Sequence, residues 1–204
     1  MPEMPAGTMK VICITGPIAS GKTLATHIIH NTFHVPMIKM DFIGHYVLTR
    51  SDVVEEVINL LGADVIEFGR LSRKKIAQKV FSNKSLLIEY NRLLHPIMSK
   101  QAEDIIDFFA RRGFQSAVLE AAILHDAGWD HLCNEIWTVV SPPKTVYKRL
   151  GSERFFLFYR PRRKYQMTDD EYKRYADIVI CNKYSKDIFA ETIRRLWRQR
   201  VLNR

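Results

Sequence analysis

A glycine-rich stretch near the start of the chain, GPIASGKT at Gly16 to Thr23, limits the possible folds more than any other segment. It matches the pattern GxxxxGK[ST], and it stands between a short β-branched run, Val11 to Thr15, and a helical pattern from Lys22 to about Phe33. Glycines in such a turn let backbone N–H groups surround phosphate oxygens, and the start of the helix adds the positive end of its dipole. The stretch therefore predicts a phosphate-binding loop for a nucleoside triphosphate.

Several residues of this loop have an expected task. Lys22 can reach the β- and γ-phosphates, the hydroxyl of Thr23 can bind Mg²⁺, and the N–H of Leu24 faces the α-phosphate. GTPases, ATPases and small-molecule kinases share such a loop, so the loop alone leaves the reaction open. The predicted nucleotide-binding residues here are Gly16, Pro17, Ile18, Ala19, Ser20, Gly21, Lys22, Thr23 and Leu24.

Strand and helix patterns alternate along the whole chain. This alternation predicts an α/β fold, a three-layer α/β/α core around a mainly parallel five-stranded sheet. The predicted strands are Val11–Thr15, Val35–Met40, Ser116–Leu124, Glu135–Val140 and Ile178–Cys181. Four predicted helices carry a recognisable start or stop signal: one capped by Ser51 and stopped by Gly62, one started by Pro96 and running to Gly113, a short one with a capping box at Thr168 to Glu171, and the C-terminal tail. The other predicted helices are 22–33, 72–81, 84–94 and 142–150.

The chain is expected to form a single domain over residues 1–204. Its core would comprise about 9–44, 114–150 and 176–204. A helical insertion would occupy about 45–113, and a mobile basic segment about 151–175, of which the stretch 151–164 shows no clear period.

Composition is typical of a globular protein, with 47% hydrophobic and 26% charged residues. No apolar run approaches the roughly 18 to 20 residues of a membrane span, and the opening MPEMPAGTMK does not resemble a secretory leader. We expect a cytoplasmic protein with no membrane association and with poorly ordered residues 1–8. Cys13, Cys133 and Cys181 form no CxxC pair, which favours small buried side chains in a reducing compartment.

The net charge of +9 is compatible with nucleic acid, an acidic membrane surface or a polyanionic small substrate as partner. Much of the excess lies between Arg149 and Arg174 and in the tail from Lys186 to Arg204. The pattern favours a packed amphipathic helix with a solvated basic face over a nucleic-acid arm. The apolar residues of the tail at helical spacing are Ile188, Phe189, Thr192, Ile193, Leu196 and Trp197.

Two carboxylates are candidates for the chemistry. Asp41 ends the second predicted strand, where it can accept a proton from an attacking hydroxyl or, alternatively, cap the following helix. Glu120 is expected in the middle of a strand beside the first one, where it either holds a water bound to Mg²⁺ or is a satisfied buried carboxylate. Both alternatives stay open for each residue.

These residues resemble the dephospho-coenzyme A kinase family, P-loop enzymes similar to nucleoside monophosphate kinases that use ATP to phosphorylate the ribose 3′-hydroxyl of dephospho-coenzyme A. The resemblance extends from about Val11 to Ser185. The opening TG-x-I-x-SGK[ST] is matched from Thr15 to Thr23. The pattern D-x-D-x-I-x-R is matched from Lys39 to His45: Asp41 is kept, and Lys39 and His45 replace an aspartate and an arginine.

Further motifs of the family appear along the chain. Gly69 to Arg73 resembles G-x-L-D-R with Ser72 in place of the aspartate, and an HP pair stands at His95. The other matched segments are Val80–Phe81, Glu120–Leu124 with Ala122 where the family has proline, the lid pattern R-x-x-x-Q at Arg162–Gln166, and ADxVIxN at Ala176–Asn182.

The resemblance implies roles for these positions and ATP with Mg²⁺ as cofactors. Asp41, Lys22, Arg149 and Arg162 would be catalytic, and Asn182 would lie near the adenine. The implied substrate-binding residues are Asp41, Arg73, His95 and Glu120, for dephospho-coenzyme A as a small-molecule partner, with no nucleic acid and no membrane.

Three alternatives remain open at this point. The chain could be another P-loop nucleotide or small-molecule kinase, such as a nucleoside monophosphate kinase. It could be a catalytically weakened ATP-binding protein, which would bind ATP without acceptor-dependent ADP release. It could be a nucleic-acid-associated ATPase, as the basic tail suggests, but the sequence offers no second motif for that function.

Overall fold

The computed structural model describes residues 9–203, so the expectation of disorder in residues 1–8 lies outside the described part. The chain divides into two compact units. We call the residues up to Lys39 together with those from Ile105 onward the sheet unit, and Met40–Asp104 the helical unit.

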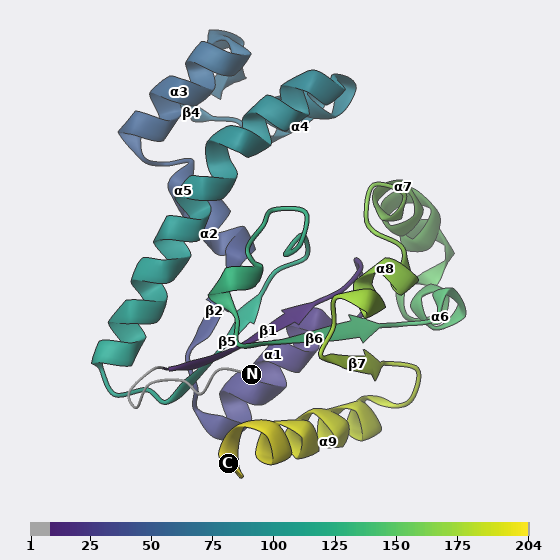
Figure 1. Ribbon diagram of the computed structural model, residues 1–204. Coiled ribbons are helices and arrows are strands. Elements are labelled where there is room, and N and C mark those ends of the chain that lie inside the picture. The colour runs from purple at the N-terminus through teal and green to yellow at the C-terminus, as the bar shows by residue number, and fades with distance from the viewer. Residues whose placement is uncertain (1–8, 204) are drawn as a thin grey trace. The chain divides into compact units, whose positions relative to one another are not determined.

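The sheet unit is built on a five-stranded sheet in the order β2-β5-β1-β6-β7, with every neighbouring pair parallel (Figure 1). The predicted α/β class is therefore confirmed. Two strands are shorter than predicted, because the chain enters a helix at Met40 and leaves the sheet after Glu120. The strands are β1 (Lys10–Thr15), β2 (Met37–Lys39), β5 (Ser116–Glu120), β6 (Glu135–Val140) and β7 (Ile178–Cys181).

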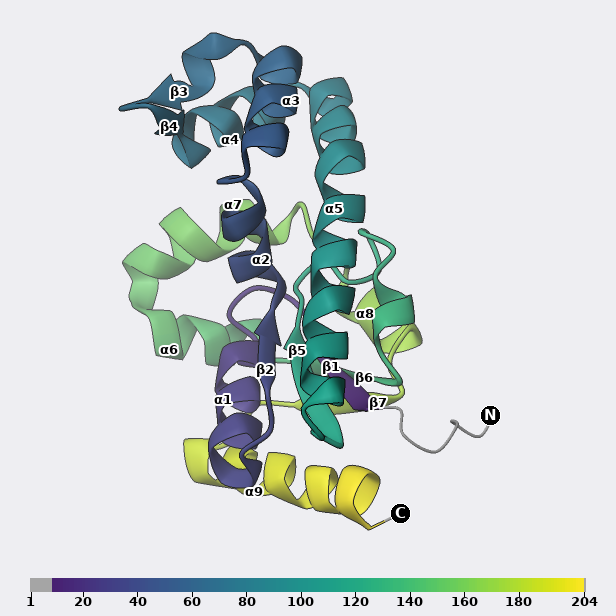
Figure 2. The ribbon, with the colours of Figure 1, turned by 90° about the vertical axis from the view of Figure 1, so that its left-hand side faces the viewer.

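Helices α1 (Lys22–Phe33) and α9 (Lys186–Trp197) lie side by side against one face of this sheet (Figures 1 and 2). Phe33 of α1 stacks on Trp197 of α9 with 5.9 Å between ring centroids. On another side of the sheet, α8 (Asp169–Arg174) is attached through buried Tyr172, whose hydroxyl donates to the Ala122 carbonyl at 2.9 Å. The predicted capping box at Thr168 and Glu171 starts α8.

The basic C-terminal tail is the amphipathic helix that the sequence predicts. Phe189, Ile193 and Trp197 are buried, whereas Arg195 and Arg198 face solvent. Ile188 was expected on the apolar face, but it is 54% exposed because it lies in the first turn, beside the cap Ser185. A π-helical turn η4 (Arg198–Leu202) follows α9.

The segment predicted to lack regular structure, 151–164, is helical. Helix α6 (Pro143–Arg154) passes a non-helical Gly151 and continues into a π-helical segment η3 (Phe155–Tyr159) and α7 (Arg160–Arg163). Phe155 stacks on Tyr159, with 4.9 Å between centroids, and Tyr159 is buried. The sequence shows no helical period here because most other side chains of the segment are exposed and carry no pattern.

The helical unit contains α2 (Met40–Val47), α3 (Ser51–Leu61), α4 (Arg73–Ser82) and most of α5 (Lys84–Arg111), with a short hairpin of β3 (Ile66–Glu67) and β4 (Arg70–Leu71). Gly62 ends α3 as predicted, but Ser51 is its first residue and Arg50 is its cap. The two helices predicted on either side of Pro96 are one 28-residue helix, α5, since Asn83 caps its start and the helix tolerates one missing N–H donor. Short 3₁₀ turns are η1 (Ala63–Val65) and η2 (Asp130–Leu132).

The cysteines differ from expectation. Cys13 is buried in β1, but Cys133 is partly exposed and Cys181 is exposed. Cys181 ends the edge strand β7, where alternate side chains face solvent, and this explains the difference. Within residues 9–203, none of the helices combines the length and the apolar character that a membrane span requires.

Candidate active site

The predicted phosphate loop connects the end of β1 to the start of α1 and requires its glycines. Gly16 has φ 132° and Gly21 has φ 110°, backbone conformations that other residues rarely adopt. A Cβ atom on Gly16 would overlap the backbone carbonyl oxygen of Val139, and a Cβ atom on Gly21 would overlap the side-chain nitrogen Nδ2 of Asn182. The glycines therefore allow both the turn and the close approach of β6 and the loop after β7.

Lys22 lies against the loop that it follows in the sequence pattern. Its Nζ donates to the carbonyl oxygens of Gly16 and Pro17, each at 2.9 Å. The side chain is half-buried, so its ammonium group lies close to the loop and is only partly exposed to solvent. This arrangement provides an ammonium group beside backbone N–H groups at a helix start, which is the composition of a phosphate site.

Thr23 and Glu120 meet at the same end of the sheet. Glu120 is the last residue of β5 and not a mid-strand residue as expected, because β5 ends there opposite Ile14 of β1. The hydroxyl of Thr23 donates to Glu120 Oε1 at 2.5 Å, and Thr26 donates to Oε2 at 3.1 Å. Lys39 Nζ lies 4.0 Å from the same Oε2.

This cluster fits a Mg²⁺ ion of the kind that accompanies a nucleotide. Magnesium is usually held by one or two carboxylates together with substrate phosphates and retained waters. Thr23 and Glu120 supply one hydroxyl and one carboxylate within hydrogen-bond distance of each other, next to the loop. The hydroxyl and the carboxylate are thus suitable, whereas the ammonium of Lys39 opposes a cation at this place and offsets part of the charge of Glu120.

A second cluster surrounds Asn182, which is buried at the end of β7. Its Nδ2 donates to the carbonyl of Ser20 in the loop at 2.8 Å, and its Oδ1 accepts from Arg149 Nη2 at 2.8 Å. Ser141 donates to the carbonyl of Asn182 at 2.8 Å. A cavity of about 450 Å³ lies here, lined by Ala19, Gly21, Leu24, Arg149, Asn182, Tyr184, Ser185 and Lys186.

The two arginines expected near the transferred phosphate lie in different surroundings. Arg149 on α6 lines the Asn182 cavity and also approaches the Tyr184 carbonyl at 3.3 Å. Arg162 on α7 is exposed and stacks on Phe158, with its guanidinium carbon 4.1 Å from the ring centroid. Gln166, at the end of the same segment, accepts a hydrogen bond from the loop N–H of Ile18 at 2.8 Å.

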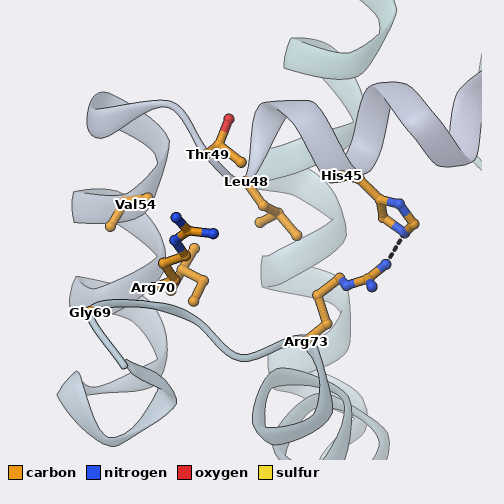
Figure 3. A pocket seen from close by; sticks show the side chains of 8 residues that line it. His45, Leu48, Thr49, Val54, Gly69, Arg70 and Arg73 are labelled. Atoms are coloured by element: carbon orange, nitrogen blue, oxygen red, sulfur yellow. Dashed lines mark hydrogen bonds between the residues drawn. The ribbon is translucent and has the colours of Figure 1, made fainter. Parts of the chain in front are cut away.

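The remaining predicted residues belong to the helical unit. Asp41 is exposed and is the second residue of α2, so it lies in the first helical turn and not at the cap position. Arg73 is the first residue of α4, and its guanidinium is hydrogen-bonded to Nε2 of His45 (Figure 3). His95 is half-buried on α5, one residue before Pro96.

The structure thus brings together the loop, Thr23 and Glu120, and it brings Arg149 to Asn182. Sequence reasoning did not identify three contributors: Ser141, Gln166 as a partner of the loop, and Lys39 as a partner of Glu120. One signal was available, because Lys39 ends β2 and Ser141 directly follows β6, and the carboxyl ends of parallel strands share one edge of a sheet. Nothing in the sequence indicates the contact between Gln166 and Ile18.

The central strand of the parallel sheet continues through a glycine-rich loop into a helix, and a lysine lies on that loop. These features define a P-loop nucleotide-binding protein. The family model described as dephospho-CoA kinase matches residues 10–187 of the chain. The chain belongs to the dephospho-CoA kinase family.

Curated relatives agree with this assignment, and solved structures show the same fold. A dephospho-CoA kinase of Dehalococcoides mccartyi is 30% identical over 198 residues, covering 95% of this chain and 98% of the relative. One from Corynebacterium diphtheriae is 28% identical, covering 94% and 97%. In fold, the chain is similar to a crystal structure of a Thermus thermophilus protein, with a TM-score of 0.76, 22% identity and coverage of 95% and 99%. A dephospho-CoA kinase from Campylobacter jejuni has a TM-score of 0.68, 18% identity and coverage of 93% and 96%.

The Asn182 cavity leads to a prediction about nucleotide affinity. Arg149→Ala should raise the KM for ATP by about tenfold, because the hydrogen bonds of a guanidinium are worth about 1.5–3 kcal/mol each when charged groups take part. Lys148→Ala, the neighbouring exposed cation on α6, is the matched control and should leave the KM unchanged. Initial rates at varied ATP measure both. Equal KM values in the two variants would contradict a role of Arg149 in nucleotide binding.

Proposed function

We propose that this chain transfers the γ-phosphate of ATP to the ribose 3′-hydroxyl of dephospho-coenzyme A, which gives coenzyme A in the last step of its biosynthesis. The observation that carries the proposal is the match of the dephospho-CoA kinase family over residues 10–187, which includes the loop and the Asn182 cluster. Curated relatives with that name cover nearly the whole chain, as their coverage of 95% shows for the first of them.

ATP is proposed to bind with its phosphates in the loop from Gly16 to Thr23. The ammonium of Lys22 would exchange its two loop carbonyls for the β- and γ-phosphates, since a phosphate oxygen carries a charge opposite to that of the ammonium, whereas a carbonyl oxygen is neutral. The cavity beside Asn182 and Arg149 has room for the base and sugar, which accords with its volume of about 450 Å³. Arg149 would then hold the nucleoside in place.

Mg²⁺ is proposed to bind at Thr23 and Glu120, with Thr23 as a direct ligand. The ion supplies charge neutralisation for the phosphates when it is bound. Glu120 orients the Thr23 hydroxyl by accepting a hydrogen bond from it at 2.5 Å, and the positive charge of Lys39 offsets part of the negative charge of Glu120.

Asp41 is proposed to orient the acceptor hydroxyl and to accept its proton during attack on the γ-phosphate. Lys22 and an arginine, Arg149 or Arg162, would offset the charge that develops on the transferred group. Glu120, besides its role at the metal, together with Arg73 and His95 would contribute to binding of dephospho-coenzyme A. These roles follow from the resemblance of each position to the family pattern.

We also propose a separate function for each of two segments of the chain. The helices of about 45–113 would bind the acceptor, and the segment of about 151–175 would close over ATP and exclude water, which otherwise hydrolyses it. Gln166 supports this second role, because it already connects that segment to the N–H of Ile18 in the loop. The positive net charge of +9 then suits two polyanionic small molecules, without a nucleic acid or a membrane as partner, in a cytoplasmic setting.

One assay tests the proposal: ADP release coupled to a colour reaction, measured with ATP and Mg²⁺, with and without dephospho-coenzyme A. We expect release that depends on dephospho-coenzyme A and on Mg²⁺. Phosphorylation of a nucleoside monophosphate instead would indicate another nucleotide kinase. ATP binding with no acceptor-dependent release would indicate a weakened ATP-binding protein, and stimulation by DNA or RNA would indicate a nucleic-acid-associated ATPase.

A further inference from the structure

The peptide between Pro17 and Ile18 in the phosphate loop is held on both of its sides. Its carbonyl oxygen accepts a hydrogen bond from Lys22 Nζ at 2.9 Å, and its N–H donates to Oε1 of Gln166 at 2.8 Å. The C=O and the N–H of a trans peptide point in opposite directions. Lys22 and Gln166 therefore contact this peptide from opposite sides.

The turn that contains this peptide carries backbone strain. The N–H of Ser20 donates to the carbonyl of Pro17 at 3.2 Å, which closes a four-residue turn, and Ala19 within it has φ 60°. A turn with a positive φ at its third residue usually has glycine there, because a Cβ atom is strained at that angle. Strained backbone persists only where its surroundings hold it. The bonds from Lys22 and Gln166 therefore help to keep the shape of the loop.

Arg163 fixes the backbone from which the side chain of Gln166 extends. Its Nη1 donates to the carbonyl of Met167 at 2.6 Å and to that of Gln166 at 3.4 Å, and its Nη2 pairs with Asp169 at 2.7 Å. Asp169 begins α8, which is attached to the sheet through buried Tyr172. Gln166 is thus anchored on the side of the sheet before it reaches the loop.

Gln166 also lies at the end of the arginine-rich stretch 152–162, which we call the basic arm. The arm begins after the non-helical Gly151 and ends at Arg162. The N–H of Tyr165 donates to the carbonyl of Arg162 at 3.3 Å, and the N–H of Gln166 donates to that of Arg163 at 3.3 Å. One tight turn therefore separates the end of the arm from the residue that is bonded to the loop.

We propose that Gln166 is a positioning residue for phosphoryl transfer, acting through the N–H of Ile18. Once Lys22 has turned to the phosphates, Ser20 is the remaining partner on the carbonyl side of the peptide, and Gln166 holds the amide side. The same bond keeps the end of the basic arm at the loop, so that the arm, and not water, covers the γ-phosphate. The inference rests on the proposed function for the use of ATP.

Hydrogen exchange of the Ile18 amide, followed by NMR, tests the contact itself. Gln166→Met keeps the length of the side chain but removes the acceptor. Exchange should become about three- to tenfold faster, the equilibrium factor of one hydrogen bond. Gln166→Glu keeps an acceptor and should exchange as slowly as the parent. The difference between parent and Gln166→Met must persist with Mg²⁺ and a non-hydrolysable ATP analogue, because the bond is proposed to remain when the nucleotide is bound.

The partition of ATP between water and the acceptor tests the positioning role. The measured ratio is ADP release without dephospho-coenzyme A divided by ADP release with it. Gln166→Met should raise this ratio by about three- to tenfold, because one hydrogen bond no longer holds the arm over the loop. Gln166→Glu should return the ratio to that of the parent, although its added negative charge raises the KM for ATP. Gln78→Met, an exposed glutamine on α4, is the matched control and should keep the parental ratio.

The ratio separates positioning from a loss of folded protein. A variant that is merely less well folded loses both activities by the same factor, so its ratio stays that of the parent. An unchanged ratio in Gln166→Met, or an equally raised ratio in Gln166→Met and Gln166→Glu, would overturn the inference. So would a difference in Ile18 exchange that disappears when the ATP analogue binds.

The two measurements also separate this inference from the proposed function. ADP release by the parent that does not depend on dephospho-coenzyme A would refute the proposed acceptor. Exchange of the Ile18 amide needs no acceptor, so it still decides the role of Gln166 in that case. Faster exchange in Gln166→Met with the ATP analogue bound would support the contact, and exchange equal to that of the parent would overturn it.

Discussion

Asp41→Asn should lower the turnover number by about 10²–10⁴-fold, the usual contribution of a general base, while the KM for ATP stays nearly unchanged. The amide keeps the size and most hydrogen bonds of the carboxylate but cannot accept a proton from the acceptor hydroxyl. Asp41 is exposed in the first turn of α2, so the substitution removes no buried contact. Steady-state rates at saturating ATP and dephospho-coenzyme A provide the measurement.

The control for this variant is Asp52→Asn. Asp52 also lies in the first turn of a helix, α3, in the helical unit, and it is paired with Arg50 at 2.6 Å. Either substitution removes a favourable interaction between a carboxylate and the positive end of the helix dipole. Turnover should fall in Asp41→Asn alone. If Asp41→Asn works as fast as the parent, Asp41 contributes only to the start of α2.

Lys22→Ala should abolish both useful binding of ATP and measurable turnover. The lost ammonium would have made charge-assisted hydrogen bonds to the β- and γ-phosphates, each worth about 1.5–3 kcal/mol. These bonds strengthen as charge moves onto the transferred group, so removal of such a donor costs a further factor of about 10²–10³ in turnover. Binding of a fluorescent ATP analogue and ADP release measure the two effects separately.

Lys22 also bonds two loop carbonyls, so its removal could loosen the loop. Thermal unfolding of the variant distinguishes loss of charge from loss of fold, since a folded but inactive protein isolates the contribution to ATP binding. Lys144→Ala, an exposed lysine on α6, controls for the reduction in net charge and should keep parental activity. Retained catalysis in Lys22→Ala would refute the assignment of the loop as the ATP site.

The two largest effects concern residues that sequence reasoning identified, and the reason is local. A phosphate loop depends on residues adjacent in the chain: two glycines with unusual backbone angles, a lysine and a helix start. The strand runs and the capping box of α8 are also local patterns with one physical cause each. Each of these elements is present in the structure, and the differences from the predictions concern the residues at which strands and helices begin or end.

The wrong predictions share a different cause. Pro96 was expected to start a helix, but α5 passes through it, because the cap at Asn83 and a buried face that includes Leu94 and Met98 outweigh one lost backbone hydrogen bond. The Phe155–Tyr159 segment is helical because its rings pack on each other, which no periodicity reports. Packing, in both cases, overrides the local signal.

The amino-acid sequence was sufficient for the class of fold, the phosphate loop and the family, since each rests on residues close in the chain or on a matched pattern. The partners of the functional side chains required the folded chain. Arg149 meets Asn182, which is 33 positions away, and Arg73 meets His45, which is 28 positions away. Such contacts depend on how strands and helices pack. The residues next to each partner in the sequence therefore do not indicate which distant side chain it will contact.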